Sequence, residues 1–98
     1  MTQKKVYNYV IILSKQARKD ADNLIKAGLK EKTDQILNAM VEDPFVYPPA
    51  YEKLTGNYKG KYSRRINRQH RIVYMVDEER KEILIIRMWT HYDNITYY

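Results

Sequence analysis

Residues 51–74 read YEKLTGNYKGKYSRRINRQHRIVY, and this stretch decides how the rest of the chain is organised. Its segment 57–71 contains no Asp or Glu and six cations: Lys59, Lys61, Arg64, Arg65, Arg68 and Arg71. Like charges packed side by side repel one another and must stay solvated or find counter-ions. The excess therefore favours a polyanion-binding surface, since arginine forks match phosphate oxygens and the interleaved tyrosines offer stacking faces for bases. The plain alternative is a solvated basic hairpin without a ligand.

The size and charge of the chain place this surface within a small globular protein. At 98 residues the chain has room for one core, so we expect a single domain over residues 1–98. The formal net charge is +6, and the six cations of segment 57–71 equal that excess. The basicity is therefore local. A local patch indicates a binding face whose attraction for its ligand weakens with salt.

Several classes of protein are disfavoured by what the sequence lacks. It has no cysteine, which excludes disulfides, Cys-ligated zinc and thiol nucleophiles. The two histidines, His70 and His91, have no recognisable metal-ligand spacing, so we expect neither a metal nor another cofactor. The N-terminus lacks the apolar segment of a signal peptide, and no apolar run approaches the ~20 residues of a membrane span. We therefore expect a cytoplasmic protein without a membrane partner.

The N-terminal half predicts a strand followed by two helices. Residues 7–13 end in a continuous apolar run, which indicates a strand buried on both faces. Ser14 is a suitable N-cap for a helix that ends at Gly28, and a second helix is expected over residues 30–42. The short link at Gly28 favours an antiparallel helical hairpin. Residues 44–49, PFVYPP, form a stiff extended loop that leads residues 51–54 to a sheet edge.

The C-terminal half predicts three strands, over residues 61–67, 71–77 and 81–90, joined by short polar links. The expected order is β-α-α-β-β-β. This order predicts an α+β fold with an antiparallel or mixed sheet and the helical hairpin on one face. The opposite face is then free for the cations.

Two residues that flank the cationic run suit RNA cleavage. Cleavage without a metal needs a base for the 2′-hydroxyl, an acid for the departing 5′-oxygen, and cations around the phosphorane. Glu52 is the candidate base and His91 the candidate acid, and strand alternation would place His91 on the same face as Trp89 and Arg87. The structural alternatives are a simple ion pair for Glu52 and a surface histidine for His91. His70 is interpreted as a turn residue.

The sequence resembles the YoeB/Txe branch of the RelE-like bacterial toxins. The motifs that carry this resemblance are, in order, EKL at 52–54, YSRRIN at 62–67, QHRIVY at 69–74 and HY at 91–92. The resemblance implies a RelE-like fold and a metal-independent endoribonuclease that enters the ribosomal A site and cuts mRNA by attack of the 2′-hydroxyl.

The resemblance also assigns a role to individual residues. It implies that Glu52 is the general base, His91 the general acid, and Tyr92 a residue that packs beside the site. Arg65 and Arg71 would surround the scissile phosphate. The remaining cations would bind RNA or the ribosome: Lys53, Lys59, Lys61, Arg64 and Arg68. Two departures are that Thr55 stands where some relatives carry lysine, a charge that Lys53 or Lys59 would supply, and that the chain continues past Tyr92 to Tyr98.

The partners implied are a YefM-like antitoxin, the ribosome with its mRNA, and operator DNA only through the antitoxin complex. A homodimer is compatible with the resemblance. Two other functions stay open on the residues alone. One is a non-catalytic RNA-binding module that blocks translation by occupancy, and the other is a DNA-binding repressor, although no helix-turn-helix pattern is present.

Overall fold

The structure is a computed structural model that describes residues 8–89; residues 1–7 and 90–98 lie outside the described part. Within residues 8–89 the elements follow one another as β1 (Val10–Leu13), α1 (Lys15–Lys26), α2 (Lys30–Glu42), β2 (Tyr51–Lys53), the short 3-10 helix η1 (Gly56–Tyr58), β3 (Tyr62–Arg65), β4 (Arg71–Asp77) and β5 (Glu82–Arg87). The predicted α+β fold is confirmed. Residues 51–53, which were expected only to reach the sheet edge, form a further strand.

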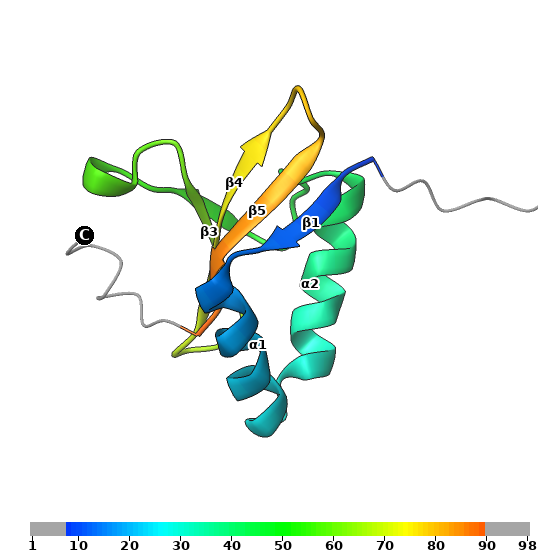
Figure 1. Ribbon diagram of the computed structural model, residues 1–98, viewed down its shortest axis with the longest axis vertical. Helices are drawn as coiled ribbons and strands as arrows, with labels where there is room; N and C mark the ends of the chain where they lie inside the picture. Colours follow the sequence, from blue (N-terminus) through cyan, green and yellow to red (C-terminus); the bar gives the residue numbers. More distant parts are fainter. Residues whose placement is uncertain (1–7, 90–98) are drawn as a thin grey trace, which may run out of the picture.

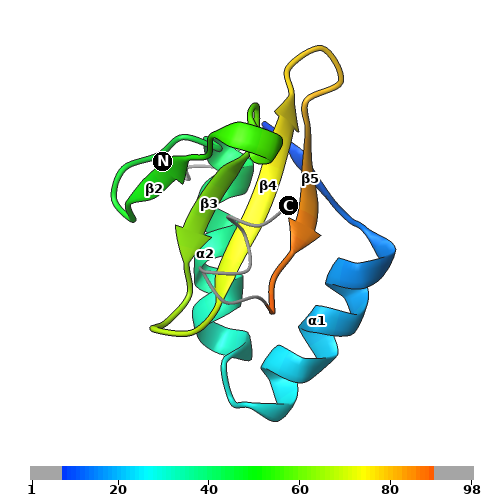
Figure 2. The same ribbon diagram turned by 90° about the vertical axis from the view of Figure 1, so that its left-hand side faces the viewer.

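The strands form one mixed sheet in the order β1-β5-β4-β3-β2. β1 is parallel to β5, and the other neighbours are antiparallel. Both helices cover the same face of the sheet, whereas η1 projects on the other side (Figure 1). Figure 2 views the sheet from the face that the helices leave open. This open face is where β2, β3 and β4 can present polar side chains.

The helical hairpin is held by local signals near its ends. Ser14 is the N-cap of α1, and its Oγ accepts a hydrogen bond from the backbone N–H of Ala17 at 3.0 Å. The same hydroxyl donates to the carbonyl of Ile86 at 2.8 Å, which ties the start of α1 to β5. Gly28 has a φ of +77°, a conformation that glycine adopts without strain. The chain therefore reverses directly into α2, as the sequence predicts.

The main core lies between the helices and the sheet. Its buried apolar members are Ala17, Leu24, Ile36, Met40, Ile66, Ile72, Tyr74, Ile83, Ile85 and Met88. Most come from both helices and from the helix-facing positions of β4 and β5, as period-2 strands and a 3.6-period helix require, and Ile66 and Met88 lie just past the ends of β3 and β5. A second, smaller cluster, Leu54 and Val73 with Tyr58 and Ile86 packed against it, lies apart from this core.

The prediction that the first strand is buried on both faces is wrong. Ile11 and Leu13 pack against the core, but Val10 is 63% exposed and Ile12 is also exposed. β1 lies at the edge of the sheet, and only one sheet face carries helices. Alternate side chains of an edge strand then reach solvent, however apolar the run. Neither described helix is long and apolar enough to cross a membrane.

Candidate active site

The candidate site lies at the end of the sheet where β2 begins and β3 turns into β4. β2 begins at Tyr51, opposite Arg64, so on the β2 side the last residue of β3 and the following turn have no strand beside them. The space left there is a groove of about 590 Å³ lined by Lys32, Pro49, Ala50, Glu52, Arg65, Ile66, Asn67, Arg68 and Arg71. The structure thus brings four of the predicted site residues, from β2, β3, β4 and the β3–β4 turn, to one groove.

Strand register explains how Glu52 and Arg71 meet. Glu52 is paired with Ser63 across β2 and β3, and Ser63 is paired with Val73 across β3 and β4. Arg71 lies two residues before Val73 and so points to the same face. Its Nη2 donates to Glu52 Oε1 at 2.9 Å, and its Nε donates to Ser63 Oγ. Ser63 is a site residue that sequence reasoning missed, although its position opposite Glu52 follows once the register is known.

The two members of this ion pair differ strongly in exposure. The Arg71 side chain is 4% exposed, whereas the Glu52 side chain is 50% exposed. The guanidinium therefore lies beneath the carboxylate and holds it from the protein side. A planar fork that binds both a carboxylate and a hydroxyl has little freedom to turn. Glu52 is consequently presented to the groove in a defined orientation.

Arg65 adds a second guanidinium beside the first. It is paired with Arg71 across β3 and β4, so the two side chains emerge on the same face of the sheet. Arg65 is exposed and, within residues 8–89, forms no ion pair. Arg68, in the β3–β4 turn, is exposed and lines the same groove. Such uncompensated neighbours attract an anion, and a phosphate fits their donors.

The prediction that Arg64 binds RNA is wrong. Arg64 is 0% exposed, and its guanidinium donates to the carbonyls of Pro44, Val46 and Pro49. The guanidinium also lies 5.0 Å from the centre of the Tyr51 ring. Successive side chains of a strand point to opposite faces, so Arg64 must enter the interior if Ser63 and Arg65 face the groove. Strand alternation could have predicted that Arg64 is buried, but the run of six cations suggested a single exposed surface.

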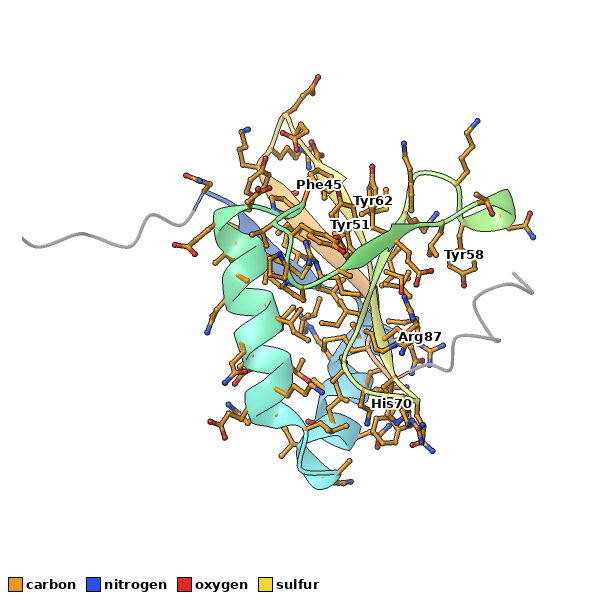
Figure 3. The ribbon with its side chains drawn as sticks, turned by 180° about the vertical axis from the view of Figure 1, so that it is seen from behind. Phe45, Tyr51, Tyr58, Tyr62, His70 and Arg87 are labelled. Carbon is orange, nitrogen blue, oxygen red and sulfur yellow. The ribbon has the colours of Figure 1, made fainter. Side chains whose placement is uncertain are left out.

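Arg64 and several aromatic side chains hold the segment 44–50, which leads into β2, in place. Phe45 packs against the rings of Tyr51 and Tyr62, with ring centres 5.7 and 4.9 Å apart (Figure 3). The buried Tyr74 hydroxyl donates to the carbonyl of Pro44 at 2.9 Å. Burial raises the pKa of Tyr74, although nearby Arg64 opposes the shift. The neutral phenol and the buried guanidinium thus hold the strand that carries Glu52.

The three predicted binding lysines do not line the groove. Lys53 and Lys59 are exposed and lie on β2 and just beyond η1. Lys61 is partly buried, with its Nζ 5.7 Å from the centre of the Tyr58 ring. The structure therefore divides the cationic run between a groove, an interior position and a separate loop surface.

His91 and Tyr92 lie outside the described residues. The strand that was expected to carry them ends at Arg87, short of the predicted residue 90. Arg87 turns towards α1, where its Nε donates to Asp20 Oδ2 at 2.9 Å. Trp89 instead stacks on His70 in the β3–β4 turn, with ring centres 3.7 Å apart. β5 ends at Arg87, so the strand alternation that was expected to place Arg87, Trp89 and His91 on one face does not continue to Trp89. His70 and Arg87 are labelled in Figure 3.

Asp20 binds the chain where it leaves β5, at Arg87 and Met88. The residue is 1% exposed, and its carboxylate accepts hydrogen bonds from Arg87, from the backbone N–H of Met88 and from Gln16. Burial by itself raises the pKa of Asp20, but the hydrogen bonds together outweigh it, so the pKa lies below its usual value. Within residues 8–89, no three His, Asp or Glu side chains lie together in a way that could hold a metal ion.

Most of the chain matches a known protein family. Residues 7–92 match the family described as the YoeB-like toxin of bacterial type II toxin-antitoxin systems. Toxin YoeB of Synechocystis sp. is 36% identical over 64 residues, which are 65% of this chain and 72% of that protein.

Two solved toxins also share the fold. The YoeB/ParE toxin from Agrobacterium tumefaciens superposes with a TM-score of 0.77 at 26% identity and covers 85% of this chain and 99% of its own. The Staphylococcus aureus toxin, solved as a YoeB-YefM complex, has a TM-score of 0.73 at 32% identity and covers 86% of this chain and 98% of its own. A YoeB dimer from Staphylococcus aureus has a TM-score of 0.74 at 32% identity and covers 87% of this chain and 99% of its own.

A mixed sheet backed on one face by a helical hairpin is the fold of the RelE-like toxins. The family match over most of the chain is more specific. The chain belongs to the YoeB-like toxins of bacterial type II toxin–antitoxin systems.

Proposed function

We propose that this toxin is an endoribonuclease that cuts mRNA in the ribosomal A site and so inhibits translation. One observation carries the proposal: Glu52 is held by the buried Arg71 at 2.9 Å, at a groove whose other charged residues are cations. A carboxylate fixed beside a phosphate-binding surface is the arrangement that attack by a 2′-hydroxyl requires.

In the proposed reaction Glu52 takes the proton from the 2′-hydroxyl. The 2′-oxygen then forms a bond to phosphorus while the bond from phosphorus to the 5′-oxygen breaks. The departing 5′-oxygen takes a proton and becomes a 5′-hydroxyl, and the other fragment ends in a 2′,3′-cyclic phosphate. His91, outside the described residues, is the proposed donor of that proton, and Tyr92 is the residue proposed to pack beside it.

The arginines have separate tasks in this scheme. Arg65 is free of ion pairs among residues 8–89, so it can approach the non-bridging phosphate oxygens and stabilise the charge that develops on them. Arg71 keeps Glu52 oriented and contributes positive charge from below. Arg68 binds the RNA backbone further along the groove. Lys53 on β2 and Lys59 and Lys61 after η1 do not line the groove, and we expect them to contact ribosomal RNA.

The proposed partners follow from the relatives. The S. aureus toxin is found with YefM, so we expect a YefM-like antitoxin with an acidic segment that neutralises the groove. A YoeB from the same species was solved as a dimer, so we expect this toxin to form a homodimer. Operator DNA would be contacted only through the antitoxin complex. Ribosome-bound mRNA as the substrate places the activity in the cytoplasm.

The test is to map the 5′ ends of mRNA after brief expression of the toxin, with the Glu52→Gln variant as comparison. New ends within translated codons that depend on Glu52 are the expected result. Arrest of growth without new RNA ends would overturn cleavage and support the alternative, a non-catalytic module that blocks the ribosome by occupancy.

A further inference from the structure

The groove at Glu52 continues over helix α2. A second hollow of about 270 Å³ is lined by Lys32, Gln35, Ile36, Pro49 and Arg65. Three of these residues, Lys32, Pro49 and Arg65, also line the groove that contains Glu52. The two hollows therefore form one continuous surface. In Figure 2 the start of α2 and the β3–β4 turn lie at the same end of the molecule.

The walls of this continuation are positively charged. Lys32 is exposed on the first turn of α2, and within residues 8–89 it forms no ion pair. Its neighbour Lys30 differs, because its Nζ lies 2.6 Å from Asp34 Oδ2. Among residues 8–89, the only carboxylate that lines either hollow is Glu52, which Arg71 already binds. An anion that lies between Lys32 and Arg65 would therefore meet two cations and no competing acid.

The floor of the continuation is apolar. Pro49 lines both hollows, the buried Ile66 lines the groove at Glu52, and the buried Ile36 lines its continuation. Gln35, three residues after Lys32, adds an amide that can donate or accept a hydrogen bond. An apolar floor with cationic rims suits a strand of RNA, whose sugars and bases cover the floor while its phosphates face the rims.

We propose that Lys32 binds a backbone phosphate of the RNA substrate, next to the scissile one, on the side of the strand that runs from Glu52 towards α2. This inference rests on the proposed ribonuclease function. Arg65 lines both hollows, so it lies between the scissile phosphate and its neighbour and fixes their spacing. The toxin then holds more than the nucleotides at the cut, and the sequence gives no sign of this, because Lys32 lies outside the cationic run.

The test measures binding of single-stranded RNA in which 2′-fluoro groups replace the 2′-hydroxyls, so that no strand can be cut. A series of increasing length is titrated against wild type, Lys32→Ala, Lys32→Arg and the control Lys19→Ala. Lys19 is exposed on α1 and lines neither hollow, so its removal changes the charge equally. Both alanine variants should fold, since alanine is the best helix former, and thermal unfolding checks this.

We expect Lys32→Ala to weaken the longer oligonucleotides about fivefold, the scale of one exposed charge contact, and to lower the salt slope by about 0.7. Lys32→Arg should restore binding, and Lys19→Ala should leave it unchanged. The shortest strands, which cannot reach α2, should bind all variants alike. Equal losses in Lys32→Ala and Lys19→Ala, or no loss in either, would overturn the proposal.

This experiment separates the two proposals. Uncleavable RNA reports on binding alone, so Lys32-dependent binding without any cleavage of ordinary mRNA would support the subsite and overturn the ribonuclease. Cleavage that depends on Glu52, with binding insensitive to Lys32, would overturn only the subsite.

Discussion

Asp20 Oδ2 accepts a hydrogen bond from Arg87 Nε at 2.9 Å, and this contact joins helix α1 to the end of β5. The same oxygen accepts the backbone N–H of Met88 at 2.9 Å. Arg87 in turn donates to the carbonyl of Trp89 at 3.1 Å. Asp20 thus holds the backbone immediately before residues 90–98, which include the proposed acid His91.

Replacement of Asp20 should destabilise the protein in a pH-dependent way. Asp20→Ala removes one partner of a buried pair and leaves Met88 N–H without its acceptor, so we expect a loss of about 3 kcal/mol at pH 7. The folded-state pKa of Asp20 is lowered. Its contribution is therefore present above the unfolded-state value of about 3.9 and is lost as the pH falls through the folded-state value.

The measurement is chemical unfolding of wild type and Asp20→Ala at pH 7 and at successively lower pH. The difference in unfolding free energy should shrink below about pH 4. Asp22→Ala, which removes an exposed carboxylate from the same helix, serves as control. A difference that stays constant down to acid pH would contradict this account.

Glu52→Gln should lower mRNA cleavage by about 10²–10⁴, the usual contribution of a positioned base. The amide oxygen can still accept from Arg71, so the fold should be retained. The rate of ribosome-programmed cleavage is the measurement, with Glu79→Gln in the exposed β4–β5 turn as control. Wild-type cleavage by Glu52→Gln would remove Glu52 from the reaction. The same assay on His91→Ala tests the proposed acid.

Arg64→Met should reduce stability rather than RNA affinity. The substitution removes the Arg64 donor from the carbonyls of Val46 and Pro49 and leaves that of Pro44 with Tyr74 alone, and we expect a loss of about 3 kcal/mol. Arg68→Met, at an exposed turn position, should leave stability unchanged and weaken RNA binding. Thermal unfolding and oligonucleotide titration of both variants check this. The reverse pattern would show that Arg64 is a binding residue after all.

Arg71→Lys should impair catalysis although it keeps the charge. Lysine lacks the fork that binds Glu52 and Ser63 together, so the carboxylate loses its fixed orientation. We expect cleavage to fall by about 10²-fold, the cost of a small misplacement of a reacting group. Single-turnover cleavage with saturating toxin separates this effect from binding. Ser63→Ala should show a smaller loss, and an Arg71→Lys variant as active as wild type would rule out the orienting role.

The local sequence was sufficient for the order of the elements. Ser14 and Gly28 mark the ends of the first helix through short-range hydrogen bonding and backbone geometry, and Asn67 closes the β3–β4 turn by accepting from the backbone N–H of Gln69 and His70. The cationic run predicted a basic binding surface as a whole, and three of its six cations, Arg65, Arg68 and Arg71, line the groove. These features depend on neighbours in the chain, which the sequence displays directly.

Tertiary structure decided which side chains work together. Arg64 and Arg65 are adjacent and chemically identical, yet Arg64 is buried against the Tyr51 ring and Arg65 faces the groove. Strand alternation determines only that the two side chains point to opposite faces, and the helices that cover one face of the sheet decide which of them is buried. The exposure of Val10 and the place of Lys32 beside Arg65 likewise depend on which elements pack together. Contacts between distant segments form only when the helical hairpin packs on one face of the sheet. The opposite face and its end then remain open and form the candidate site.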